Sequence, residues 1–176
     1  MGHAMKRLDR KLLILGAAVY LYVLIKIILF KYAPVDIAFL WRQLHSVLEH
    51  PGRIRYGLAF ANFTPFVSIS QNLHRLSNPH DFVNLFGNIA LFVPLGIFIR
   101  MLAKGGLFKA LVLSFGISFS LEGTQLLLSM GSFDVDDLIL NVLGGLLGYI
   151  ICLKSPRKHG KAQLQQQVLT EGTRFK

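Results

Sequence analysis

The amino-acid sequence predicts an all-α membrane protein with four transmembrane helices and an extracytoplasmic amphipathic helix between the first two. Of the 176 residues, 53% are hydrophobic and only 16% are charged, whereas soluble domains average about 25% charged residues. Four apolar runs also reach the roughly 20 residues that a helix needs to cross a bilayer. We interpret residues 12–153 as one transmembrane domain, flanked by a basic tail at 1–11 and a basic, glutamine-rich tail at 154–176.

The four apolar runs cover residues 12–30, 83–102, 107–129 and 137–153. Lysine and arginine gather in both tails and in the short connection between the second and third runs, whereas the connection before the fourth run holds acids and no base. Short basic flanks stay on the cytoplasmic side of a membrane. We therefore predict that both termini are cytoplasmic and that the acidic connection lies outside.

The long connection between the first and second runs is more than a linker. Apolar residues at 35–50 recur every three or four positions until Pro51-Gly52, as on one face of a helix. This helix either lies in the outer membrane interface, with Trp41 at headgroup level, or packs across the top of the bundle. Residues 56–70 are apolar, aromatic and broken by Pro65, which favours a re-entrant or surface-lying hairpin. Residues 71–81 are polar and predict a loop.

Polar residues occur in pairs in the outer halves of the last three runs, at a spacing of three or four that places each pair on one helix face. Facing lipid they would cost free energy, so we expect the pairs to face one another inside the bundle. The asparagines are also explained by interhelical hydrogen bonding alone. The pairs are Asn84 with Asn88, Glu122 with Gln125, and Asp137 with Asn141.

Three acids lead into the fourth run: Asp134, Asp136 and Asp137. One interpretation is structural, because Asp134 suits the N-cap and the other two suit the positive end of the helix dipole. The other is functional, because carboxyl groups near the bilayer interior usually serve a site. In that case Glu122 and Asp137 are the candidate catalytic residues, with Glu122 as general acid or base, and the remaining acids and amides line a ligand site.

Arg53, Arg55 and Arg75 of the outer connection are candidates to bind a phosphate or carboxylate, which the guanidinium fork suits. The alternative is that each faces solvent or lipid headgroups. No recognised metal-ligand spacing is present, so we predict no metal and no cofactor. Gly144 and Gly148 have the spacing that allows close packing of membrane helices.

Four segments in order resemble the VanZ-like membrane proteins: NFTPF (62–66), NLFGNIALFVPLG (84–96), SLEGTQ (120–125) and FDVDDLILNVLGGLLGY (133–149). The resemblance covers residues 12–153. It departs at Gly131-Ser132, where the family usually has an arginine, so an anion-binding role of that arginine would pass to the outer segment. The resemblance implies the bacterial cytoplasmic membrane, a role in the cell envelope and low-level resistance to the glycopeptide teicoplanin. It supplies no catalytic residue.

Three functional hypotheses follow. The first is an outer-leaflet polar site that binds or alters an envelope lipid or a lipid-linked cell-wall intermediate, and we expect no nucleic-acid partner. The second is an enzyme acting on such a lipid through Glu122 and the acidic turn, which holds Asp134, Asp136 and Asp137. No nucleophilic Ser, Cys or Lys motif is present, however. The third is a non-catalytic scaffold for envelope proteins, in which the polar residues only hold helices together. The first hypothesis fits the sequence best.

Overall fold

The computed structural model describes residues 2–30, 34–103 and 105–154, and their side chains from Asp9 onward. These residues form seven helices and no strand, which confirms the all-α prediction. The predicted tail at 154–176 lies outside the described residues after Lys154. The helices are α1 (Gly2–Phe30), α2 (Ile37–Glu49), α3 (Gly52–Ala59), α4 (Val67–His74), α5 (Pro79–Leu102), α6 (Leu107–Leu127) and α7 (Val135–Lys154).

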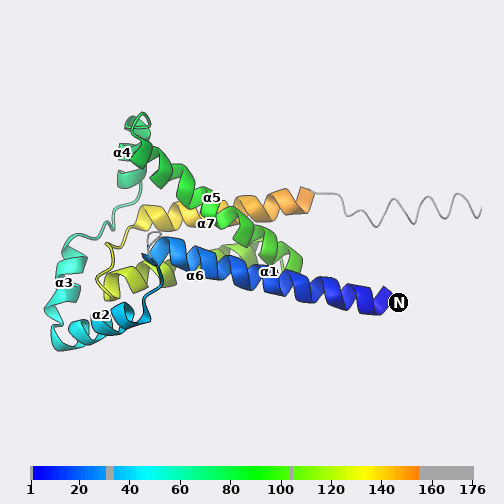
Figure 1. Ribbon diagram of the computed structural model, residues 1–176. Helices are drawn as coiled ribbons and strands as arrows, with labels where there is room; N and C mark the ends of the chain where they lie inside the picture. Colours follow the sequence, from blue (N-terminus) through cyan, green and yellow to red (C-terminus); the bar gives the residue numbers. More distant parts are fainter. Residues whose placement is uncertain (1, 31–33, 104, 155–176) are drawn as a thin grey trace, which may run out of the picture.

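Four helices, α1, α5, α6 and α7, are long and apolar enough to cross a membrane, as predicted. Figure 1 shows them as one bundle, with the start of α1 and the end of α7 at the same end. The short helices α2, α3 and α4 lie at the opposite end, together with the connection between α6 and α7. The outer connection and the acidic turn therefore share one end of the bundle.

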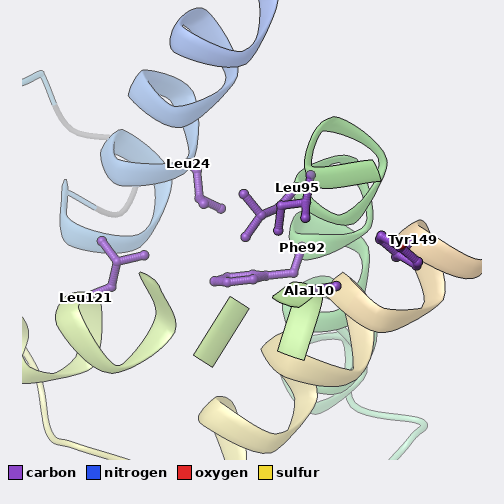
Figure 2. Close-up of a cluster of buried hydrophobic side chains, with 7 residues drawn as sticks. Leu24, Phe92, Leu95, Ala110, Leu121 and Tyr149 are labelled. Atoms are coloured by element: carbon purple, nitrogen blue, oxygen red, sulfur yellow. The ribbon is translucent and has the colours of Figure 1, made fainter. Parts of the chain in front are cut away.

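The bundle core draws side chains from all four long helices. In Figure 2 the ring of Phe92 from α5 lies between Leu24 of α1, Leu121 of α6 and Ala110 of α6, and the cluster also includes Leu95, Ile99 and Tyr149. Many other large apolar side chains face outward, such as Phe108, which is 76% exposed. Apolar residues both inside and outside the bundle are expected where the surroundings are lipid.

Helices α5 and α7 pack through glycine. A Cβ atom at Gly148 would lie 1.9 Å from the carbonyl oxygen of Val93, and one at Gly144 would lie 2.2 Å from that of Ile89. No side chain fits at either distance, so the two backbones are in direct contact. The close packing predicted from the glycine spacing is confirmed.

Helix α2 is the predicted amphipathic helix. Its N-cap Asp36 accepts the Phe39 N–H at 2.9 Å, and it ends before Pro51. Only Val47 of α2 is buried, whereas Trp41 is 67% exposed and Leu48 is 71% exposed. Most of the apolar face of α2 is therefore not covered by other described residues. This differs from the alternative in which α2 packs this face across the top of the bundle.

The predicted loop at 71–81 is wrong, because α4 continues to His74 and α5 begins at Pro79. The Asn78 side chain accepts the His80 N–H at 3.0 Å, and proline occupies the first position of the helix. Both features favour a helix start, and they outweigh the polar composition. Residues 56–70, for which a hairpin is predicted, form the end of α3, an irregular segment and the start of α4.

Candidate functional site

The acidic turn before α7 is organised around Asp134. Its Oδ1 accepts the Asp136 N–H at 2.8 Å, as an N-cap does, and the Asn62 side-chain amide at 2.9 Å. Its Oδ2 accepts the Ser68 hydroxyl at 2.6 Å. The Asn62 backbone also pairs with the turn, because its N–H donates to the Phe133 carbonyl at 2.8 Å. Asp134 thus both caps α7 and holds the α3–α4 connection against it.

Asp136 is fully buried and caps a different helix. Its Oδ1 accepts the Phe66 N–H at 2.6 Å and its Oδ2 accepts the Ile69 N–H at 3.1 Å, both at the N-terminus of α4. Phe66 itself has a left-handed φ of 70°. A carboxylate at this helix end satisfies orphan donors and suits the helix dipole. The structure therefore gives Asp136, predicted as a ligand-binding residue, a bonding role between α7 and α4.

Glu122 and Asp137, the candidate catalytic residues, lie at the same end of the bundle. Glu122 is 4% exposed, and its Oε2 accepts the Asp134 N–H at 3.3 Å. Asp137 is half-buried and accepts the Asn88 side-chain amide at 2.6 Å. These contacts join α6 to the acidic turn and α5 to α7, so the structure brings Asn88, Glu122, Asp134, Asp136 and Asp137 into one region.

The other predicted polar residues take different partners. Gln125 donates to the Ile28 carbonyl of α1 at 2.9 Å. Asn141 donates to the Ser118 hydroxyl at 2.9 Å, and its buried Oδ1 has no hydrogen-bond partner among the described residues. Asn84 is half-buried and has no side-chain hydrogen bond within the same residues. Two of the predicted pairs, Glu122 with Gln125 and Asp137 with Asn141, therefore split between different partners, and of the third pair only Asn88 has a side-chain partner among the described residues.

Of the three candidate arginines, Arg53 lies beside residues 129–132, which precede the acidic turn. It is half-buried and lines a cavity of about 630 Å³. Its guanidinium Nη1 donates to the Ser46 hydroxyl of α2. Arg55 and Arg75 are exposed, and neither side chain has a hydrogen bond or ion pair to a described residue. The lining residues of this arginine cavity are Arg53, Tyr56, Gly57, Phe60, Ser129, Met130, Gly131 and Ser132.

A second cavity of about 570 Å³ adjoins the first. It lies between the end of α1, the start of α2 and the end of α6, and its wall is mainly hydrocarbon. Ser129 and Met130 line both cavities, and Ser129 has a left-handed φ of 52°. The lining residues of this apolar cavity are Leu29, Phe30, Pro34, Asp36, Phe39, Ser129 and Met130.

Sequence reasoning missed the partners of two polar side chains, Asp134 and Asn141. Asn62 and Ser68 bind Asp134, and Ser118 binds Asn141. Ser118 lies four residues before Glu122 and so on the same face of α6, which was a usable signal. Within the part of the chain described, no group of three or more His, Cys, Asp or Glu residues is placed to hold a metal ion.

All four segments that carry the resemblance contribute residues to α4, α5, α6 or α7 or to the connections between these helices and α3. A family model described as VanZ/LLP1 matches residues 17–155. This chain belongs to the VanZ/LLP1 family. The protein VanZ of Enterococcus faecium is 26% identical to it over 156 residues, which cover 88% of this chain and 82% of the relative. No solved structure matches the chain. Together with the four apolar helices, the family makes this a membrane protein of VanZ type.

Proposed function

We propose that this VanZ-family protein binds a phosphate-bearing envelope lipid or a lipid-linked cell-wall intermediate, and thereby confers low-level resistance to teicoplanin. We place the acidic-turn end outside the bacterial cytoplasmic membrane and both termini inside, because the start of α1 and the end of α7, which border the basic tails of the sequence, lie at the other end of the bundle (Figure 1). One observation supports the binding site best: α3 places Arg53 in a cavity against residues 129–132 of the acidic connection.

The chemistry of the arginine cavity suits an anionic head group. A guanidinium has five N–H donors, so the contact to Ser46 leaves donors for phosphate oxygens. Ser129 and Ser132 are polar residues of the same lining, and Tyr56 and Phe60 are its aromatic residues. This is the mixture of a few polar groups and aromatic surface that is typical of ligand pockets.

Arg53 also stands where the family resemblance leads us to expect a cation. Gly131 and Ser132 occupy the positions at which VanZ-like proteins usually have an arginine, and both line the arginine cavity. The small residues leave room that a side chain from α3 can reach. We infer that Arg53 supplies from another helix the charge that the turn itself lacks.

In this proposal the acids position the site instead of performing chemistry. Asp134 and Asp136 fix the α3–α4 connection to α7, and Glu122 holds the turn through the Asp134 N–H. Because residues 129–132 precede this turn directly, its rigidity sets the wall that faces Arg53. A binding function therefore accounts for the buried carboxylates without a reaction.

The test is teicoplanin susceptibility of a sensitive host that expresses the wild type, Arg53→Gln or Arg55→Gln, with equal membrane levels confirmed by immunoblot. We expect Arg53→Gln to lose the resistance that the wild type confers. Arg55→Gln is the matched control, because Arg55 lies on the same helix and outside the cavity lining, and it should retain resistance. Resistance retained by Arg53→Gln would sink the proposed site.

Glu122→Gln separates binding from catalysis in the same host. The glutamine side chain keeps an oxygen that can accept the Asp134 N–H, so a positioning role survives the substitution. We expect resistance to persist and the extracted envelope lipids to be unchanged. Loss of resistance at equal protein level, together with a lipid product that disappears, would favour the enzyme instead.

A further inference from the structure

The two cavities at the acidic-turn end differ in chemistry and share one wall. The arginine cavity has Arg53 and two serines in its lining. The apolar cavity has Leu29, Phe30, Pro34 and Phe39 in its lining. Ser129 and Met130 separate them and belong to both. A single elongated molecule that crosses this wall would therefore meet a cationic compartment at one end and a hydrocarbon compartment at the other.

Charge fixes the direction in which such a molecule would lie. Among the described residues that line the apolar cavity, Asp36 is the one acid, and its carboxylate also accepts from the Arg42 guanidinium at 3.3 Å. An anionic group in that cavity would meet a carboxylate that is already paired with Arg42, whereas in the other it would meet Arg53, which has no carboxylate partner among the described residues. Because like charges repel and unlike charges attract, the anionic end belongs with Arg53 and the hydrocarbon end with Phe39.

Location supports a ligand from the membrane. Phe30 is the last residue of α1, which is long and apolar enough to cross a membrane, and it lines the apolar cavity. Phe39 of α2 lines the apolar cavity, and Ser46 of the same helix accepts a hydrogen bond from Arg53, which lines the arginine cavity. Helix α2 therefore contacts both cavities.

We propose that the two cavities form one site for an amphiphile, with its phosphate at Arg53 and the first part of its hydrocarbon chain against Leu29, Phe30 and Phe39. This inference rests on the proposed function and adds that the chain is recognised as well as the phosphate. Met130 lines both cavities, so it would contact the ligand where the phosphate head group meets the hydrocarbon chain.

The experiment measures calorimetric binding of n-alkyl phosphates, from ethyl to octyl, to the protein in nanodiscs, with inorganic phosphate as the head group alone and empty nanodiscs as the blank. Burial of a methylene from water is worth about 0.8 kcal/mol, or roughly fourfold in affinity, as an upper bound. We expect affinity to rise with each added methylene and then to level off once the chain fills the apolar cavity.

Variants locate the chain. Phe39→Trp narrows the apolar cavity and should make affinity level off at a shorter chain. Phe39→Ala enlarges the cavity and should shift that point to a longer chain, which keeps the test valid if one variant fails to fold. Leu48→Trp is the matched control, because it adds the same ring to the exposed face of α2, and it should match the wild type.

Each other outcome is distinct. Chain-independent binding that Arg53→Gln abolishes would overturn the two-cavity inference and leave the proposed phosphate site intact. Chain-dependent binding that Arg53→Gln does not change would overturn the phosphate site and the inference with it. Equal uptake by empty nanodiscs would show partition into the bilayer only and would also refute the inference.

Discussion

The burial of Asp136 predicts a local loss of stability that can be measured. Asp136→Ala removes the acceptor of two backbone N–H groups, those of Phe66 and Ile69, from a side chain with no exposed surface. A buried donor left without a partner costs about 1–3 kcal/mol. The two donors together therefore set a range of about 2–6 kcal/mol.

The lower part of this range is the better expectation. The N-terminus of α4 lies near the surface, where Phe66 and Val67 are exposed, so water can reach the freed donors once the helix end moves. We expect a loss of about 2 kcal/mol, which is roughly a thirtyfold change in the local opening equilibrium.

Hydrogen exchange of the α4 amides, followed by mass spectrometry in detergent or nanodiscs, measures this opening directly. Exchange in α4 should accelerate about thirtyfold in Asp136→Ala, while the amides of α5 and α7 keep their protection. Asp36→Ala is the control, because Asp36 caps α2 through one exposed hydrogen bond, and its effect should stay within α2 at about 0.5–2 kcal/mol. Unchanged exchange in α4 of Asp136→Ala would refute the capping argument.

Three further predictions concern packing, polar coupling and the membrane. Gly148→Ala places a methyl group against a backbone carbonyl of α5 and should lower thermal stability by at least about 1–3 kcal/mol. Gly116→Ala is the control, because its methyl group meets open space and should not lower stability. Equal melting curves of the two variants would contradict this prediction. A double-mutant cycle of Asn88→Ala and Asp137→Ala should give a coupling of about 0.5–2 kcal/mol in unfolding free energy, and additive effects would show no direct bond. Trp41 is the single tryptophan, so the tryptophan fluorescence of the protein reports on α2. If α2 lies in the interface, lipids that carry bromine near the headgroup should quench this fluorescence. Fluorescence that these lipids do not change would place α2 in water.

The sequence by itself determined the membrane-spanning helices and their packing seam. Hydrophobic length is a property of consecutive residues, so the spans at 83–102 and 107–129 could be predicted to within a few residues of α5 and α6. The contact at Gly148 could be predicted for a similar reason, because helical periodicity places Gly144 and Gly148 on one face. The N-cap role of Asp134 is also local, since its acceptor binds an N–H two residues later.

Only the tertiary structure decided which polar groups meet. Asp136 binds N–H groups of Phe66 and Ile69, about 70 positions away in the chain, and no periodicity encodes such a partner. The same holds for the arginines: Arg53 and Arg55 are two positions apart, and a helix turns about 200° over that distance, so one faces the cavity while the other faces away. Which of them does so depends on how α3 is rotated against the connection between α6 and α7. That rotation is fixed by contacts between distant segments, and the sequence of α3 alone does not contain it.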